Sequence, residues 1–246
     1  NSCLSVIGAK RLHIPIFHME AGNRCFDECL PEETNRKIVD IISDVNICYS
    51  EHARRYLNAS SVAPQRTYVS GSPMAEVLHE NLVEIETSDI HKRLGLEKGK
   101  YILLSAHREE NIDTEKNFFN LMNAVNELAK KYDMPILYSC HPRSKKFIEQ
   151  RGFVFDDRVI RHQPLGFHDY NHLQMNAFAV VSDSGTLPEE SSYFLSVGHP
   201  FPAVCIRTST ERPEALDKGG FILAGITTEQ VLQAVDVAVE MNRNGA

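Results

Sequence analysis

Short apolar runs alternate with amphipathic runs along almost all of the 246 residues, and this alternation restricts the fold more than any other feature. The apolar runs have the length of strands, whereas runs such as "NFFNLMNAVNELAKKY" repeat apolar residues with helical spacing. Such alternation is typical of parallel sheets covered by helices on both faces. The predicted strands are 14–18, 45–49, 67–70, 101–105, 135–140, 159–161, 179–182, 203–206 and 221–224. The predicted helices are 31–42, 51–58, 75–82, 88–94, 115–132, 144–151, 170–175, 188–195, 212–218 and 228–242.

A polar and charged segment, "HENLVEIETSDIHKRLGLEKGK", interrupts the pattern before the fresh strand "YILLSA". We place a domain boundary there, giving domains 1–83 and 84–246. The second block holds a complete set of strand–helix units, but the first has too few strands for a self-sufficient doubly wound sheet. The expected fold is therefore α/β with two Rossmann-like domains, of which the N-terminal one is incomplete.

Composition excludes several classes of protein. The chain is 42% hydrophobic and 24% charged with a net charge of -7, which gives no general reason to expect binding to nucleic acid or to a membrane surface. No apolar run approaches the ~20 residues of a membrane span. Cys25 and Cys29 lie four apart without a second close pair, so we expect no metal site. Other cysteines lie in strand-like runs and are interpreted as small core residues of a reduced, cytoplasmic protein.

Polar loops follow six of the predicted strands. They are "HMEAGNR", "GSP", "AHREEN", "HPR", "DSGTLPEES" and "RTSTERPEA". Ligands of open parallel sheets bind beyond the carboxyl ends of the strands. We therefore expect a binding cleft at this edge, between two domains of similar architecture.

The loop "DSGTLPEES" suits a phosphate. Ser184, Gly185 and Thr186 precede a helix that Pro188 opens, and free N–H groups with the helix dipole attract anions there. Glu189 and Glu190 in the first turn are candidates to accept hydrogen bonds from ribose hydroxyls. The alternative is ordinary capping, because acids in a first turn are common for electrostatic reasons.

Two His-Arg pairs follow buried strands: His107 with Arg108, and His141 with Arg143. They would give the cleft a positive potential that matches a diphosphate. A lone His at a strand end is more often structural, but two pairs on one face favour function.

Two further segments complete the nucleotide side. "RTSTERPEA", with Arg207 and Arg212, is interpreted as another phosphate loop or as a solvated connection. Tyr170, at a loop–helix junction, is either a stacking platform for a base or a core residue.

The stretch "HMEAGNRCFDECLPEETNR" is crowded with charge after "RLHIPIFHM", which is predicted to be a buried strand. Glu20 lies just beyond that strand and Glu32 at the start of the next helix, so the two carboxylates are candidates for acid and base. Arg36, one turn after Glu32, would hold one of them ionised. The alternative is a plain ion pair between Glu32 and Arg36.

In their order, "HMEAGNR", "PEETNRK", "GSP", "SAHREEN", "HPR", "DSGTLPEE" and "TERPEA" resemble the non-hydrolysing UDP-N-acetylglucosamine 2-epimerase family. The resemblance covers almost the whole chain and implies a two-domain fold like that of GT-B glycosyltransferases, with UDP-sugar in the interdomain cleft. It implies removal of the C2 proton, anti elimination of UDP to a glycal, and re-addition of UDP, without cofactor or metal. A homodimer is expected for the full-length family protein.

Carried over motif by motif, the implied catalytic residues are Glu20, Glu32 and His107. The implied substrate-binding residues are Arg36, Arg108, His141, Arg143, Tyr170, Ser184, Gly185, Thr186, Glu190, Arg207 and Arg212.

This chain departs from the family pattern at several points. "DSGT" replaces "DSGG" and "EAGNR" replaces "EAGLR", as in the branch acting on UDP-2-acetamido-2,6-dideoxy-L-talose for capsule and O-antigen precursors. UDP-N-acetylglucosamine remains the other expected substrate. The family's catalytic Asp in a Gly-Asp-Thr element would directly precede Asn1, and its last helix would continue past Ala246. We therefore expect a fragment that is inactive or barely active alone.

Two other functions stay open. A glycosyltransferase of the same fold would share the UDP site but would need no carboxylate at Glu20. A non-catalytic UDP-sugar-binding module would need only the C-terminal domain.

Overall fold

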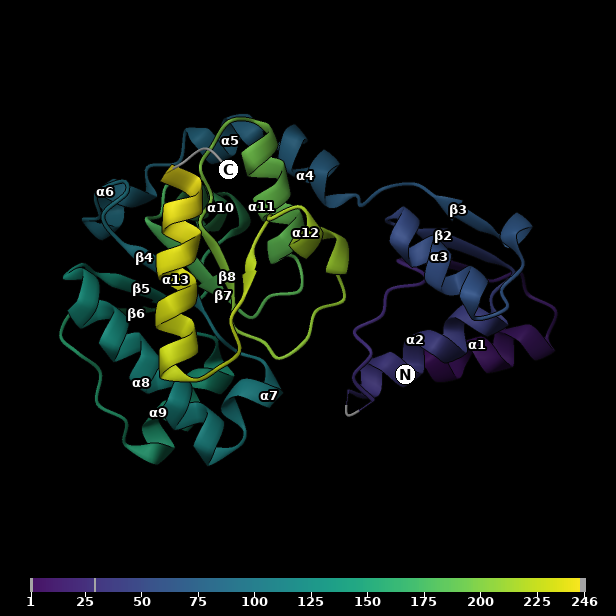
Figure 1. Cartoon of the computed structure of the whole chain (residues 1–246), viewed down its shortest axis with the longest axis horizontal. Helices are drawn as coiled ribbons and strands as arrows, with labels where there is room; N and C mark the ends of the chain where they lie inside the picture. The colour runs from purple at the N-terminus through teal and green to yellow at the C-terminus, as the bar shows by residue number, and fades with distance from the viewer. Residues whose placement is uncertain (1, 29, 244–246) are drawn as a thin grey trace. The chain divides into compact units, whose positions relative to one another are not determined.

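A computed structural model describes residues 2–28 and 30–243. The described residues do not include Asn1, Cys29 and Ala246. The expectations about the two chain ends and about the pair Cys25 and Cys29 concern these residues. The chain forms two compact units (Figure 1). Unit 1 runs to Pro73 and also includes Ser209–Glu214, whereas unit 2 comprises Met74–Thr208 and resumes at Ala215. The predicted boundary at residues 83 and 84 falls within a helix of unit 2, α5 (Leu82–Glu86).

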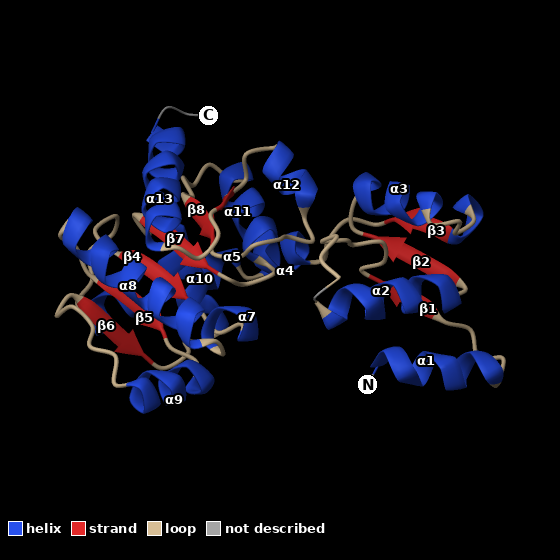
Figure 2. Ribbon diagram, turned by 60° about the horizontal axis from the view of Figure 1, so that its bottom comes forward, coloured by secondary structure: helices blue, strands red, loops and turns tan. Residues whose placement is uncertain are grey.

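Unit 1 is built on a parallel sheet in the order β1-β2-β3. Its strands are β1 (Phe17–Met19), β2 (Val45–Cys48) and β3 (Thr67–Val69), and its helices are α1 (Ser2–Arg11), α2 (Pro31–Ile42), α3 (Glu51–Ala59) and the 3₁₀ turn η1 (Pro64–Arg66). In Figure 2, α2 lies beside β1, and α3 lies beside β2 and β3. Both helices start at favourable residues: α2 has proline and two acids in its first turn, and Ser50 caps α3 by accepting from the Ala53 N–H.

The core of unit 1 is small. Its buried cluster lies between β2, α3 and the loop after β1, and consists of Ala21, Cys48, Ala53, Leu57 and Val62. The prediction of a buried strand in "RLHIPIFHM" is wrong, because Phe17 is 65% exposed and Met19 is 60% exposed. β1 is an edge strand that pairs only with β2 among the described residues, and edge strands leave more side-chain surface open.

Unit 2 is built on a six-stranded parallel sheet in the order β6-β5-β4-β7-β8-β9. Its strands are β4 (Ile102–Ser105), β5 (Ile136–Ser139), β6 (Val159–His162), β7 (Ala179–Ser182), β8 (Ala203–Cys205) and β9 (Ile222–Leu223). Its helices are α4 (Met74–Glu80), α5, α6 (Ile90–Leu94), α7 (Glu109–Ile112), α8 (Glu115–Tyr132), α9 (Pro142–Arg151), α10 (Phe167–Met175), α11 (Leu187–Ser196) and α13 (Thr228–Arg243), while α12 (Pro213–Asp217) spans the return of the chain to unit 2.

Both faces of this sheet are covered, as the alternation predicted. Ile102 and Leu104 of β4 belong to the cluster beneath α8 and α13, whereas Leu103 between them belongs to the cluster beneath α6 and α10. Each of the three side chains is at most 1% exposed. Burial of each stabilises the fold by ~1.5–3 kcal/mol. Parallel strands buried on both faces account for the near-continuous apolar runs of the sequence.

Candidate functional site at the carboxyl ends of the strands

Unit 2 changes winding direction between its two central strands. The chain continues from β4 to β5 and β6 on one side of the sheet, and from β7 to β8 and β9 on the other. β4 and β7 are therefore neighbours from which the connections diverge, and ligands of doubly wound sheets bind in the crevice at such a point. His107 and Arg108 follow β4, and Asp183–Thr186 follow β7.

Asp183 organises this crevice. Its carboxylate is fully buried, and Oδ2 accepts the backbone N–H groups of His107 and Arg108, each at 2.8 Å. The Asn111 amide also donates to Oδ2, at 3.1 Å. Oδ1 lies 3.2 Å from Nδ1 of His107. One carboxylate thus fixes the start of the loop after β4 and the orientation of the imidazole.

The same contacts shift two pKa values in opposite directions. The hydrogen bond to Asp183 raises the pKa of His107 above its ordinary value, against the opposing effect of burial. Burial alone would raise the pKa of Asp183, but the hydrogen bonds and charge of its partners outweigh it and hold that pKa below its usual range. The pair therefore favours a charged imidazolium against a carboxylate, beside a crevice suited to an anion.

The structure separates the two residues of the second His-Arg pair. The His141 ring lies 5.8 Å from the His107 ring, centroid to centroid, so the two imidazoles are neighbours. Arg143 instead donates to Glu109 at 2.6 Å and to Asp113 at 2.7 Å, and these hydrogen bonds raise its pKa. Its guanidinium is therefore engaged by acids at the two ends of α7.

The loop after β7 forms a chain of hydroxyl and carboxylate contacts. Ser184 Oγ lies 2.9 Å from Thr186 Oγ1, which donates to Glu190 Oε1 at 2.8 Å. Burial raises the pKa of Glu190. A Cβ on Gly185 would lie 3.2 Å from an Arg108 guanidinium nitrogen, so this glycine lets the arginine side chain approach the loop.

Tyr170 and Arg207 border the same edge. The Tyr170 hydroxyl is hydrogen-bonded to Ser105 and Ser182, and burial raises its pKa. Its ring also packs beside the cluster beneath α10, so both interpretations of this tyrosine keep support. The Arg207 side chain is only 2% exposed, and its Nε lies 3.6 Å from Glu110 Oε1.

Unit 1 carries the predicted acids. Glu20 directly follows β1, its side chain is 46% exposed, and Oε1 accepts from Arg212 at 2.8 Å and from Asn23 at 3.0 Å. The Arg212 guanidinium also lies over the Tyr49 ring, 5.6 Å from its centroid. The segment Ser209–Glu214 thus supplies Glu20 with a cationic partner inside unit 1.

The two adjacent acids of α2 have different surroundings. Glu32 is exposed, whereas Glu33 is fully buried and accepts from the backbone N–H of Cys25 at 3.1 Å. Arg36 lies 3.1 Å from Glu211 and 3.7 Å from Glu33. The partners of Arg36 are therefore these two acids, rather than the Glu32 of the alternative interpretation.

Two acids that the sequence did not single out hold the predicted residues in place. Asp183 orients His107, and Glu33 fixes the loop at Cys25 and approaches Arg36. The only sequence signal was position: Asp183 immediately follows a predicted strand, and Glu33 is the second acid of a helix start. Within residues 2–28 and 30–243, no three His, Cys, Asp or Glu side chains are arranged to hold a metal ion. No helix in that part of the chain is long and apolar enough to cross a membrane.

A parallel sheet wound in both directions, with polar loops at its switch point, makes unit 2 a doubly wound α/β domain. The family model of UDP-N-acetylglucosamine 2-epimerase matches residues 1–245, so the chain belongs to the UDP-N-acetylglucosamine 2-epimerase family. The family predicted from the motifs is confirmed, but the branch within it is not resolved.

Relatives and solved structures agree with this assignment. UDP-N-acetylglucosamine 2-epimerase of Methanococcus maripaludis is 32% identical over 97% of this chain and 66% of its own length. The structure of the Rickettsia bellii enzyme is 48% identical, with a TM-score of 0.86 over 97% of this chain and 62% of that one. The Methanocaldococcus jannaschii enzyme in complex with UDP-GlcNAc and UDP is 29% identical, with a TM-score of 0.86 over 95% of this chain and 65% of that one. The chain thus spans less than two thirds of the length of these proteins.

Proposed function

We propose that this chain belongs to a UDP-N-acetylhexosamine 2-epimerase that inverts C2 by anti elimination of UDP to a glycal and re-addition. Family membership over residues 1–245 is the observation that carries the proposal. In this proposal the chain is GT-B-like, unit 2 binds the UDP moiety, and Glu20 and Glu32 are the acid/base carboxylates. We propose a cytoplasmic homodimer for the full-length protein.

The chemistry explains why acids and cations are needed together. The C2 proton lies on the carbon that bears the acetamido group and is only weakly acidic, so its removal needs a positioned carboxylate, and such groups contribute ~10²–10⁴-fold to the rate. Departure of UDP develops negative charge, which the cationic His107 and Arg108 at the switch point would stabilise. The 2.8 Å contact with Arg212 holds the Glu20 carboxylate in one place, as a positioned acid/base group requires.

The substrate is either UDP-GlcNAc or UDP-2-acetamido-2,6-dideoxy-L-talose, the latter suggested by "DSGT" and "EAGNR". Relatives do not share one substrate: a Pseudomonas aeruginosa protein, 29% identical, is a UDP-2,3-diacetamido-2,3-dideoxy-D-glucuronate 2-epimerase. Either candidate sugar would place the protein in synthesis of cell-surface polysaccharide precursors such as those of capsule and O-antigen. Incubation with each UDP-sugar, followed by NMR of the products, distinguishes them.

The test of the chemistry is Glu20→Gln in the full-length protein, assayed as deuterium incorporation at C2 of the UDP-sugar in D2O. We expect exchange to fall by about 10²-fold or more, because the amide cannot take up the proton. Glu51→Gln is the matched control, since Glu51 is an exposed acid of unit 1 that pairs with Arg54 on its own helix. Normal exchange in Glu20→Gln would contradict the acid/base role of Glu20, whereas absence of C2 exchange in the unmodified full-length protein would favour a glycosyltransferase.

A second candidate is a UDP-sugar-binding module without chemistry. The observation that favours it is the difference between the sheets: six strands with a switch point in unit 2, against three in the described part of unit 1. Calorimetry of the chain with UDP separates the two functions when it is combined with the exchange assay. UDP binding by the chain without C2 exchange in the full-length protein supports the module, and absence of UDP binding overturns both.

A further inference from the structure

Glu20 has an unusual backbone conformation. Its φ is +64°, in the left-handed region that residues with a Cβ rarely adopt. Two residues later Gly22 has φ +80°, and a Cβ there would lie 2.3 Å from the Ala53 carbonyl oxygen. Two left-handed residues so close together turn the chain sharply at the end of β1. Such a conformation persists only where the surroundings hold it from several sides.

Asp40 of α2 holds this turn on both sides. Its carboxylate is fully buried, and Oδ1 accepts from the Gly22 N–H at 3.2 Å and lies 2.8 Å from Nδ1 of His18. Oδ2 lies 2.7 Å from a guanidinium nitrogen of Arg24. The three partners flank Glu20 in the sequence: His18 precedes it by two positions, Gly22 follows it by two and Arg24 follows it by four.

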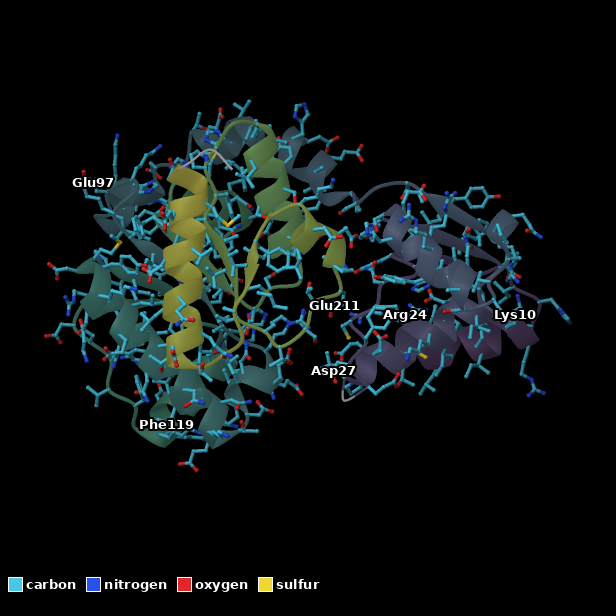
Figure 3. All side chains as sticks on the ribbon, viewed as in Figure 1. Lys10, Arg24, Asp27, Glu97, Phe119 and Glu211 are labelled. Atoms are coloured by element: carbon cyan, nitrogen blue, oxygen red, sulfur yellow. The ribbon has the colours of Figure 1, made fainter. Side chains whose placement is uncertain are left out.

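The rest of this cluster is fixed as well. Arg24, labelled in Figure 3, is only 3% exposed, and its guanidinium also donates to the Asn23 carbonyl at 2.9 Å. The Asn46 amide of β2 donates to the Asp40 carbonyl at 3.0 Å, which ties α2 to the sheet beside the turn. The carboxylate of Asp40 thus acts from a rigid position rather than from a loop.

We propose that Asp40 is a positioning residue, which sets the left-handed backbone at Glu20 and thereby aims that carboxylate. Asp40 needs no contact with substrate in this role, since it acts through His18, Gly22 and Arg24. The catalytic consequence rests on the proposed function of Glu20, but the effect on the backbone does not.

The first test measures the backbone by NMR. In the unmodified chain, the one-bond Cα–Hα coupling of Glu20 should report a positive φ; an extended value would already overturn the proposal. In Asp40→Asn, one acceptor oxygen replaces two. Either the acceptor that His18 and Gly22 share or the acceptor of Arg24 is therefore lost. We expect the Gly22 amide to exchange at least tenfold faster and the Glu20 coupling to move away from its positive-φ value.

Asp44→Asn is the matched control for this test. Asp44 lies on the opposite end of β1, where its carboxylate accepts from the Ile16 N–H at 3.0 Å and pairs with Lys10. Loss of that contact should leave Gly22 exchange and the Glu20 coupling within twofold of the unmodified chain. Asp40→Ala removes both acceptor oxygens and is the more disruptive variant. If Asp40→Ala does not fold, the result for Asp40→Asn decides the test. Unchanged Gly22 exchange and Glu20 coupling in a folded Asp40→Asn protein would overturn the proposal.

The second test is kinetic and separates this inference from the proposed function. In the full-length protein, Asp40→Asn should lower kcat at least tenfold with KM within threefold, because most of the proposed UDP-binding residues belong to unit 2. Loss of C2 exchange in Glu20→Gln together with normal kcat in Asp40→Asn would overturn the positioning role alone. Normal exchange in Glu20→Gln would overturn the proposed function and leave the backbone result standing.

Discussion

At the scale of single residues, the arrangement of charge depends on buried acids that hold exposed groups. Asp183 lies beneath His107 and accepts four hydrogen-bond or ion-pair contacts, whereas His107 itself is 43% exposed in its side chain. A buried carboxylate is costly unless its partners compensate for lost hydration, and here the partners are the loop after β4 and Asn111 of α7. The acid that orients the loop is thus also stabilised by it.

Removal of the Asp183 charge should lower the pKa of His107. In Asp183→Asn the hydrogen bond that raises this pKa is weakened, so the imidazole should titrate at lower pH than in the unmodified chain. With Asp183 present, the raised pKa stabilises the fold at pH values below ordinary histidine titration, and this stabilisation is lost as pH rises through the folded-state pKa. NMR titration of the His107 ring protons checks the shift.

Asp113→Asn provides the control for that titration, because Asp113 pairs with Arg143. The His107 titration should move less in this variant than in Asp183→Asn. An equal His107 pKa in Asp183→Asn and the unmodified chain would show that Asp183 does not set it.

The sequence predicted most of the polar groups at the switch point, but not which of them are buried or which partners they contact. Adjacent acids such as Glu32 and Glu33 look equivalent in a sequence, although a step of 100° around the helix exposes one and buries the other. Arg143 follows a strand as predicted, but acids at the two ends of α7 attract its guanidinium. A local sequence pattern does not predict which residue, far away in the sequence, a side chain contacts.

At the scale of elements, the predictions were most successful where periodicity was strong. All nine predicted strands are present in the described part of the chain, and α2 and α8 have the predicted bounds. The helices α1, α5 and α7 were missed. The first has a glycine at its middle and little one-sidedness, and the other two have five and four residues, too few for a period to be visible. β1 begins later than predicted because the Ile16 N–H is bonded to the Asp44 side chain instead of to a strand.

The packing of α6 and α10 against β4 makes stability sensitive to acid. The His91 and His172 rings lie 4.8 Å apart, and His91 Nε2 lies 3.1 Å from the Tyr101 hydroxyl, which donates to the Leu173 carbonyl. Burial, with the charge of His172, lowers the pKa of His91 to about 4. Between that value and 6.5 the unfolded chain binds the proton and the folded chain does not, so stability falls as pH drops. The loss for His91 is roughly 3 kcal/mol at full effect.

His91→Gln tests this dependence, because the amide can still donate to Tyr101 but does not titrate. Chemical unfolding between pH 7 and pH 4 should show a shallower loss of stability in His91→Gln than in the unmodified chain. His168→Gln is the control, since His168 is an exposed residue of the same helix α10 that contacts Asn81. Equal slopes in His91→Gln and the unmodified chain would contradict the assignment.

At the scale of the whole molecule, the two units differ in how much apolar surface they bury. The cluster beneath α8 and α13 contains 25 buried residues, whereas that of unit 1 contains five. Hydrophobic burial is the main favourable term in folding, so unit 1 should open at a lower free energy than unit 2. Local opening of unit 1 would release Glu20 from Arg212 while the loops of unit 2 stay intact.

Hydrogen exchange followed by mass spectrometry at increasing urea checks this order. We expect amides of α3 to lose protection at lower urea than amides of α8, because the α3 amides depend on the smaller core. Because both helices are measured in one sample, pH, temperature and urea concentration are the same for both. Simultaneous loss of protection in α3 and α8 would indicate that the units unfold as one.

Unit 1 is discontinuous in the chain, since Ser209–Glu214 joins a segment that ends at Pro73. Chains emerge from the ribosome at about 5–20 residues per second, so Glu20 must wait on the order of ten seconds or more for Arg212 to be synthesised. During that interval, unit 1 lacks one of its own parts while most of the six-stranded sheet has already been made. The unit that is first in the sequence is therefore completed late, and the order of synthesis is not the order of assembly.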